Sequence, residues 1–176
     1  MSRFSLINLV CCYALLSGCV SPGGSKDTLW VNEVVSSNDG VAIDENGQTS
    51  DYIELVNNGA AAVALKNYAI ADAGGVFAPL PDINLAAGGI IRLWADDDAA
   101  LGAYHLPFKL SAEGETLQLR NAQGEVYQQI AVPALALNES YSRFPSATGT
   151  MAVCRYATPS RPNGNTCQAS VVAPLK

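Results

Sequence analysis

The sequence predicts an all-β domain of the sandwich type, and three features of its 176 residues support this fold class. Apolar side chains recur with a period of two residues from Leu29 onward, which is the spacing of half-buried strands. Turn signals separate these segments roughly every 8 to 12 residues, as in sandwiches and barrels. Fifteen glycines and nine prolines supply the turns, and hydrophobic residues make up 49% of the chain, enough to form one core.

The N-terminal residues have the pattern of a signal peptide. Arg3 provides positive charge, and an apolar stretch of about 11 residues follows, which is too short to span a bilayer but matches a signal peptide's apolar region. It ends in Leu16-Ser17-Gly18-Cys19, which resembles the lipobox of bacterial lipoproteins. We therefore predict cleavage before Cys19 and acylation of its thiol. An ordinary secreted protein is the alternative.

Acylation would determine where the protein resides. A lipoprotein cysteine carries two or three acyl chains, and two chains suffice for stable anchoring. Val20 follows Cys19 where an aspartate would signal retention in the inner membrane, so the prediction is a lipid-anchored protein of the bacterial cell envelope, on the outer membrane. The polar, glycine-containing residues up to 28 are expected to form a short tether.

Two cysteines of the mature chain remain after acylation. Cys154 and Cys167 would lie in an oxidising compartment, so we predict a disulfide between them, with Cα atoms about 4.4 to 6.8 Å apart. A zinc site is the alternative reading, but no second cysteine pair or histidine pair accompanies them.

The strands are predicted in chain order from their residue types. β-Branched and aromatic residues favour a first strand over residues 30–35. The polar residues 36–50 follow, with the turn signatures Asn38-Asp39-Gly40 and Asn46-Gly47. Residues 51–57 alternate between apolar and polar and stop at Asn58-Gly59. Further strands are predicted at 68–71, 89–94, 116–120 and 126–131, with weaker ones at 63–65, 83–85 and 140–143. Residues 97–103 have room for one or two helical turns.

Six of these segments, taken in order over residues 28–163, resemble the lamin-tail domain family. Val31-Asn32-Glu33-Val34 is similar to the family's opening strand, and Asp51-Tyr52-Ile53-Glu54-Leu55-Val56-Asn57 to its most characteristic strand. The remaining four segments are residues 65–72, 108–117, 140–145 and 158–163. Asn67, Ser142 and Ser160 stand where the family usually has glycine. The resemblance implies an immunoglobulin-like β-sandwich that acts as a non-catalytic module.

Alternation also predicts how side chains are buried. Ile53 and Leu55 should point to one face of their strand, and Tyr52, Glu54 and Val56 to the other. A buried carboxylate needs a cation or backbone donors, so Arg143 is a candidate partner for Glu33 or Glu54. Full solvation of all three charged groups is the alternative. Trp94 and Phe108 are expected in the core.

The sequence offers little for catalysis or nucleic-acid binding. His105 is the sole histidine, it lies among apolar residues, and no nucleophile motif accompanies it, so we expect it to be structural and the protein not to be an enzyme. Without Arg3 the chain has 16 acidic and 9 basic residues, a net charge of −7, which would repel phosphate backbones.

Acidic loops are the remaining polar feature. Residues 36–50 and 95–102 are the candidate recognition loops, with Asp39, Asp44, Asn46, Asp96, Asp97 and Asp98 as candidate binding residues. Oxygen ligands at this spacing could hold calcium, but the pattern of an EF-hand is absent, so solvated loops without metal or cofactor are expected. A partner with a basic or amide-rich surface would suit their charge.

The predicted organisation is a signal peptide (1–18), a lipidated tether (19–28), a lamin-tail-like domain (29–163) and a C-terminal tail (164–176). The leading hypothesis is a membrane-anchored module that binds a protein or glycan of the cell envelope, without nucleic-acid binding. A structural subunit of an envelope assembly is one alternative. A hydrolase that uses paired carboxylates of the acidic loops is another.

Overall fold

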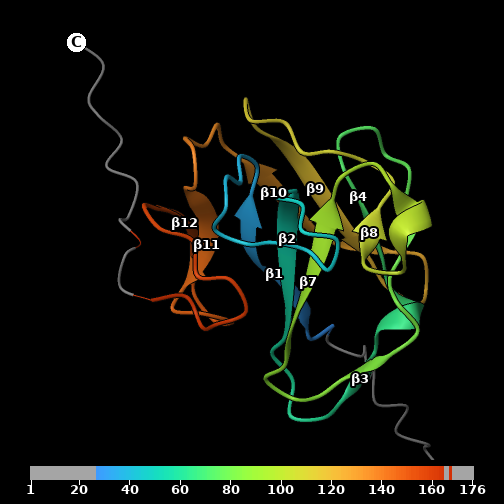
Figure 1. Cartoon of the computed structure of the whole chain (residues 1–176). Helices are drawn as coiled ribbons and strands as arrows, with labels where there is room; N and C mark the ends of the chain where they lie inside the picture. Colours follow the sequence, from blue (N-terminus) through green and yellow to red (C-terminus); the bar gives the residue numbers. More distant parts are fainter. Residues whose placement is uncertain (1–26, 165–166, 168–176) are drawn as a thin grey trace, which may run out of the picture.

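Two β-sheets face each other across one hydrophobic core (Figure 1). The computed structural model describes residues 27–164 and residue 167. The predicted signal peptide, Cys19, most of the tether and nearly all of the C-terminal tail therefore lie outside the described residues. Within the described part of the chain, no helix has the length and apolar character needed to cross a membrane.

The larger sheet has six strands in the order β12-β11-β1-β2-β7-β8. The strands are antiparallel except for the parallel pair β7 and β8. Their bounds are β1 (Leu29–Val35), β2 (Asp51–Asn57), β7 (Ile90–Ala95), β8 (His105–Leu106), β11 (Ser140–Phe144) and β12 (Thr150–Cys154).

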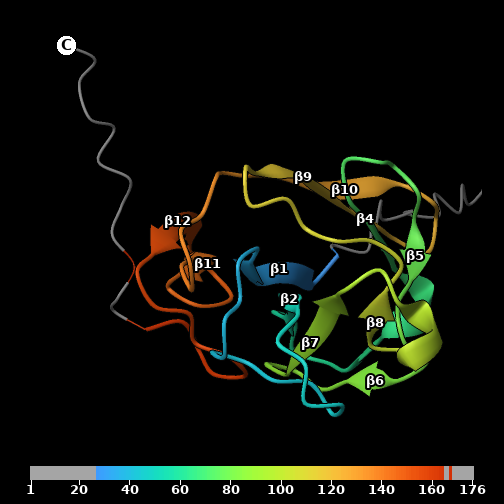
Figure 2. The same cartoon turned by 45° about the horizontal axis from the view of Figure 1, so that its top comes forward.

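The second sheet has four antiparallel strands in the order β10-β9-β4-β5. Figure 2 shows β9, β10 and β4 as a layer on one side of β1, β2 and β7. The bounds are β4 (Ala69–Ala71), β5 (Ala78–Pro79), β9 (Glu115–Arg120) and β10 (Val126–Val132), and a separate pair joins β3 (Val63–Ala64) to β6 (Asn84–Leu85). The helical elements among the described residues are two 3-10 turns, η1 (Leu65–Asn67) and η2 (Ala99–Leu101). The fold is thus the predicted all-β, immunoglobulin-like sandwich.

The alternation predicted for β2 is confirmed. Ile53 and Leu55 are fully buried in the core between the sheets, whereas Tyr52 belongs to a second apolar cluster on the outer face of the larger sheet. Phe108 is buried in the core as predicted, and Trp94 is buried beside Tyr52.

A β-bulge in β1 changes which of its side chains share a face. The register shifts between Val31 and Glu33, so Val31 and Val34 both enter the main core. Strict alternation would have placed Val31 and Glu33 on the same face. The extra residue of the bulge therefore directs Glu33 to the outer face, directly opposite Glu54 of β2.

Each of the nine segments predicted as strands contains a strand in the structure. The sequence analysis missed β5, β8 and β12, and the helical segment predicted within 97–103 is the single turn η2. Both β5 and β8 are two-residue strands, too short to show alternation, and each lies at the edge of its sheet.

The predicted disulfide joins Cys154 at the end of β12 to Cys167. The two residues face each other as an isolated antiparallel bridge, and their Cα atoms lie 3.7 Å apart. This separation is shorter than the about 4.4 to 6.8 Å that we expected.

Candidate functional site

The outer face of the six-stranded sheet is covered by two loops. The loop that follows β1, drawn in blue to cyan, passes in front of β2 and β7 in Figure 1. Its Ala42 packs with Val35, Tyr52 and Trp94, and Ala157 of the C-terminal loop lies against the same cluster. This face is therefore a second, smaller interior rather than a solvated surface.

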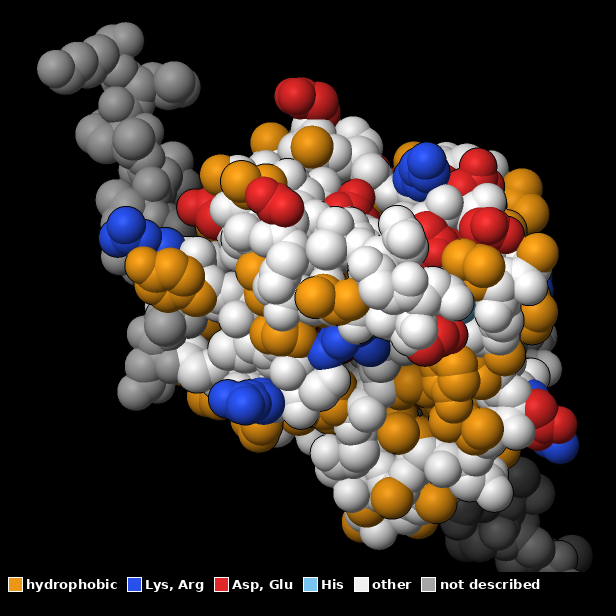
Figure 3. Space-filling view, viewed as in Figure 1, with side chains coloured by type: hydrophobic (Ala, Val, Ile, Leu, Met, Phe, Trp, Pro, Cys, Tyr) orange, Lys and Arg blue, Asp and Glu red, His pale blue; other side chains and the backbone are white. Residues whose placement is uncertain are grey.

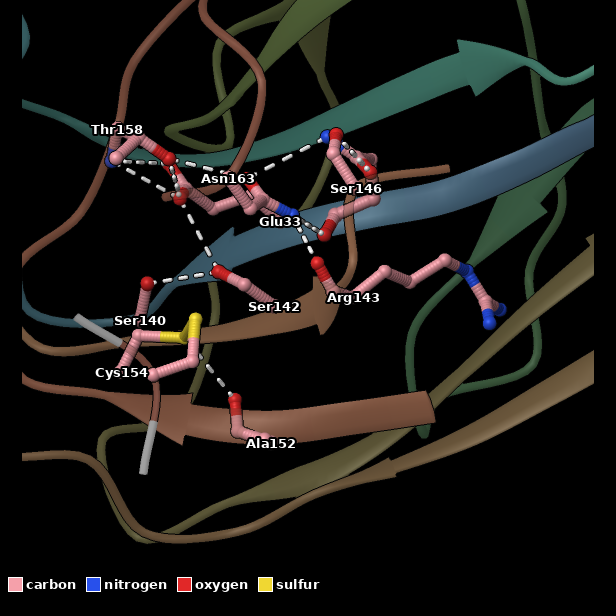
Figure 4. The surroundings of a disulfide bond; sticks show 11 residues. Glu33, Ser140, Ser142, Arg143, Ser146, Ala152, Cys154, Thr158 and Asn163 are labelled. Atoms are coloured by element: carbon pink, nitrogen blue, oxygen red, sulfur yellow. Dashed lines mark hydrogen bonds between the residues drawn. A yellow bond between two sulfur atoms is a disulfide. The ribbon is translucent and has the colours of Figure 1, made fainter. Parts of the chain in front are cut away.

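Glu33 is fully buried beneath the C-terminal loop and is the centre of a hydrogen-bond network (Figure 4). Its carboxylate accepts hydrogen bonds from the Tyr52 hydroxyl at 2.8 Å and from Ser142 Oγ at 3.1 Å. The backbone N–H and the hydroxyl of Thr158 donate to the same carboxylate at 2.9 and 2.8 Å. Glu33 thereby joins β1, β2, β11 and the C-terminal loop.

Asn163 extends this network to the turn after β11. Its side-chain amide donates to the backbone carbonyls of Asn32 and Arg143 at 2.9 and 2.8 Å, and its Oδ1 accepts from Thr158 Oγ1 at 3.0 Å. The segments that resemble the family's opening and closing elements are therefore in direct contact. Their polar residues hold the loop in place.

Glu54 is also fully buried, and its partner is Arg92 of the neighbouring strand β7. Its Oε1 accepts from Arg92 Nε and Nη2 at 3.1 and 3.0 Å and from the Ser160 N–H at 2.6 Å. Its Oε2 has no hydrogen-bond partner among the described residues. Burial raises the pKa of Glu54 to about 7, and the nearby Glu33 adds to the rise, whereas Ser160 and Arg92 oppose it.

The predicted partnership of Arg143 with Glu33 or Glu54 is wrong, and so is its alternative that all three are solvated. Arg143 is buried and donates to the carbonyls of Val31 at 2.7 Å and Gly149 at 2.9 Å. Its guanidinium also lies 4.4 Å from the centre of the Trp30 ring. Cross-strand neighbours depend on strand order, which the sequence analysis did not assign, and this order places Arg92 opposite Glu54.

The two candidate recognition loops meet at His105, the first residue of β8. Its Nδ1 lies 2.5 Å from Asp96 Oδ2, and its Nε2 lies 3.1 Å from Glu45 Oε1. Burial acts to lower the pKa of His105, but the hydrogen bonds and charges of Asp96 and Glu45 outweigh it, so the pKa is raised. A backbone hydrogen bond and the contact with His105 lower the pKa of Glu45.

Asp44 lies in the interior of the first loop rather than in solvent. Its Oδ1 accepts from the backbone N–H groups of Asn46 and Gln48 at 2.8 and 2.7 Å, which closes a tight turn. The residue is 8% exposed. Ligand atoms of Asp44, Asp96 and His105 all lie within 4.8 Å of one another.

The structure thus brings together two of the six predicted binding residues, Asp44 and Asp96. The other four are exposed on the loops: Asp39, Asn46, Asp97 and Asp98. The expectation that the loops are fully solvated is wrong for Asp44, because local hydrogen bonds fold its turn inward. His105 and Glu45 were missed as members of the site, and 60 residues separate them in the chain.

His105 also lines a hollow of about 450 Å³. Small apolar residues line most of it: Ala78, Pro79, Leu80, Pro81, Ala99, Ala103 and Pro107. Leu101 and Tyr104, which flank this region in the chain, are 43% and 39% exposed, and Ile43 beside Asp44 is 57% exposed. The loop region therefore combines acidic groups with accessible apolar side chains.

His105 contacts carboxylates through both of its ring nitrogens. Asp96 lies at Nδ1 and Glu45 at Nε2, rather than a serine or cysteine nucleophile. The closest pairing of glutamates, Glu33 with Glu54, is fully buried between strands and loops. These two carboxylates take part in hydrogen bonds and, for Glu54, in an ion pair with Arg92.

Comparison with known proteins identifies the domain. The family model described as the lamin tail domain matches residues 23–134. No curated protein matches the sequence. Beyond residue 134, β11 pairs with β1 and β12 pairs with β11, so these strands complete the larger sheet. With its sandwich of two sheets and this match over most of its length, the chain belongs to the lamin tail domain family.

Proposed function

We propose that this protein is a membrane-anchored, non-catalytic binding module of the bacterial cell envelope, held by a lipid on Cys19. Membership of an immunoglobulin-like domain family supports a binding or structural role without catalysis. The observation that carries the proposal is the convergence of two loops, distant in sequence, at His105, where they form one recognition surface on a rigid sandwich.

The direction of the strands supports a recognition surface that faces away from the membrane. The described chain enters the domain at Asp27, whose carboxylate accepts a hydrogen bond from Asn121 Nδ2 at 3.0 Å. β1 then runs from Leu29 to Val35 before the first recognition loop begins. A strand of seven residues spans roughly 20 Å, so tether and loops lie at opposite ends of β1.

The chemistry of the surface indicates the kind of partner. Glu45, Asp97 and Asp98 are exposed and acidic, and the apolar side chains of Ile43, Leu101 and Tyr104 lie near them in the chain. Figure 3 shows acidic side chains on the upper part of one face with an apolar area below. A protein segment with both cationic and apolar side chains fits this surface, and a glycan fits it less well.

Site-specific photo-crosslinking in the native envelope tests this function. A photoreactive residue at Asp97 or Ile43 should give discrete adducts with an envelope protein. The matched control is Gln123, which is exposed in the turn between β9 and β10, next to Asn121 and the tether. Equal adducts from all three positions, or none from the loops, would contradict the assignment of the recognition surface.

Assembly into a larger envelope complex is the second candidate. Leu137 and Tyr156 are 61% and 58% exposed and line a separate hollow of about 450 Å³ with Val41 and Ala157. An apolar hollow of this kind favours contact with another protein. Adducts from a photoreactive residue at Leu137, without adducts from Asp97, would favour assembly over recognition by the loops.

A further inference from the structure

Three side chains from different parts of the chain converge where the two loops meet. Asp44 comes from the loop after β1, Asp96 follows β7, and His105 begins β8. One ligand atom of each lies within 4.8 Å of the others. Glu45 is not part of this group: its Oε1 lies 3.1 Å from His105 Nε2, on the opposite side of the ring from Asp96.

An unpaired oxygen of Asp44 points to a ligand. Asp44 is 92% buried, and its Oδ1 accepts two backbone hydrogen bonds. Its Oδ2 is also buried but has no hydrogen-bond partner among the described residues. A buried carboxylate oxygen is costly unless a donor or a cation compensates it. The neighbouring histidine does not provide that compensation, because its two nitrogens contact Asp96 and Glu45.

The orientation of the three ligands is fixed by other contacts. Asp44 is held by the N–H groups of Asn46 and Gln48, and Asp96 Oδ1 accepts from the N–H of Asp98 at 3.1 Å. The backbone of His105 is fixed by parallel pairing of β8 with β7. Such supporting bonds are typical of metal ligands, whose positions are set by the groups around them.

We propose that Asp44, Asp96 and His105 bind a divalent transition-metal ion such as Zn²⁺, while Glu45 on the opposite ring nitrogen orients the imidazole. A set of one imidazole and two carboxylates suits zinc or manganese, whereas calcium takes six to eight oxygen ligands. The spacing of acidic residues within the two loops did not predict a metal site, because His105 lies outside both loops.

Binding requires a small rearrangement. Ligand atoms about 2.0 to 2.2 Å from a tetrahedral zinc ion lie roughly 3.3 Å from one another. His105 Nδ1 and Asp96 Oδ2, now 2.5 Å apart, must separate by somewhat less than 1 Å, and Asp44 must approach. Glu45 contacts the opposite ring nitrogen and can keep that contact when the ion is bound. The metal would tie the first loop to β7 and β8, independently of any partner.

Zinc titration by calorimetry tests the site on the full chain. The protein is first treated with chelator, and any free thiol is alkylated, because a free cysteine could itself bind zinc. We expect one Zn²⁺ per chain. Asp44→Asn keeps the Oδ1 acceptor of the turn but removes the charge, and it should weaken zinc binding at least tenfold. Asp98→Asn, an exposed neighbour with the same change in charge, is the matched control and should bind like the wild type.

The sole histidine provides a second readout. Because His105 is the only imidazole of the chain, its ring nitrogen resonances in NMR report on this site without assignment ambiguity. Zn²⁺ should shift them in the wild type and in Asp98→Asn, with a much weaker effect in Asp44→Asn. Unchanged far-UV circular dichroism would verify that each variant is folded.

Four results would overturn the proposal. One is the absence of zinc binding, and another is equal affinity of Asp44→Asn and Asp98→Asn. The third is zinc binding that leaves the His105 resonances unmoved, since the ion would then occupy another site. Binding of Ca²⁺ in preference to Zn²⁺ and Mn²⁺ would likewise contradict the role of the imidazole. Loss of crosslinking to a partner without loss of zinc binding would contradict the proposed recognition surface and leave the metal site standing.

Discussion

Buried carboxylates at Glu33 and Glu54 connect the scaffold to the loops that cover it. Both are fully buried and lie opposite each other in β1 and β2. Glu33 receives neutral donors from three surrounding segments, whereas Glu54 receives the Arg92 guanidinium and one backbone N–H. Each position is stable only while the C-terminal loop contributes Thr158 or Ser160, so the folding of that loop is coupled to the sheet.

Glu33→Gln is expected to lower the free energy of unfolding by roughly 2 to 4 kcal/mol. One acceptor oxygen becomes an NH₂ group, which faces donors from Tyr52, Ser142 or Thr158 and leaves at least one of them unpaired. Urea unfolding monitored by circular dichroism measures the change. Glu125→Gln, at an exposed position, is the control and should be nearly neutral. A comparable effect of both substitutions would mean that the network adds nothing to stability.

The pKa of Glu54 predicts a pH dependence of stability that Glu54→Gln should remove. Its pKa is about 7 in the folded state and 4.5 in a model peptide, so the folded state binds more protons between these values. Stability contributed by Glu54 is therefore present below pH 4.5 and is lost as the pH rises through 7. The stability of the wild type relative to Glu54→Gln should fall by about 3 kcal/mol between pH 4.5 and 7.5. If the difference in stability between the two proteins does not change with pH, Arg92 keeps Glu54 ionised over this whole pH range.

At the level of elements, the longer strands could be predicted from the sequence, because their alternation records which face is buried. Residues 51–57 are the clearest case, with Ile53 and Leu55 in the core and Tyr52 on the outer face. The β1 bulge could not be predicted, since one extra residue leaves no trace in an apolar pattern of this length. The short strands β5 and β8 exist through pairing with β4 and β7, which depends on the tertiary fold.

The candidate site was predicted only in part, for a related reason. The acidic composition of the two loops indicated Asp44 and Asp96, but their contact with His105 depends on β8 returning parallel to β7. No spacing rule connects Glu45 to a histidine 60 residues away. The available signal was a histidine nine residues after Asp96, and alone it was too weak to indicate a site.

The disulfide is expected to stabilise the edge strand β12. Cys154 and Cys167 enclose a loop with a sequence separation of 13. Closing a loop of this size lowers the conformational entropy of the unfolded chain, which stabilises the folded state by roughly 3 kcal/mol. The double variant Cys154→Ser and Cys167→Ser should lose about this much stability. Peptide mapping of the unfolded, unreduced protein after thiol labelling should find neither residue modified. Labelling of both cysteines would refute the bridge.

At the scale of the whole molecule, β1 separates the start of the domain from the loops that meet at His105. Asp27 fixes the start of the domain beside Asn121, and the loops that meet at His105 lie at the far end of β1. The net charge of −6 disfavours contact with anionic lipid headgroups, so a tethered domain of this charge should stand off the bilayer. Anchoring at Cys19 would then present the acidic loops outward.

Acylation of Cys19 is the prediction on which this arrangement depends. Cells grown with a clickable fatty acid should label the wild type and also Cys11→Ala, because Cys11 leaves with the signal peptide. Cys19→Ala should lose the label, since no other thiol stands at the end of the lipobox.

Fractionation alone is a weaker test, because an uncleaved signal peptide also holds a chain in the membrane. Mass spectrometry should therefore find a peptide that begins at Cys19, ends at Lys26 and carries the acyl mass in the wild type. A label retained in Cys19→Ala, or a mature N-terminus at another residue, would contradict the lipid anchor and with it the proposed orientation of the loops.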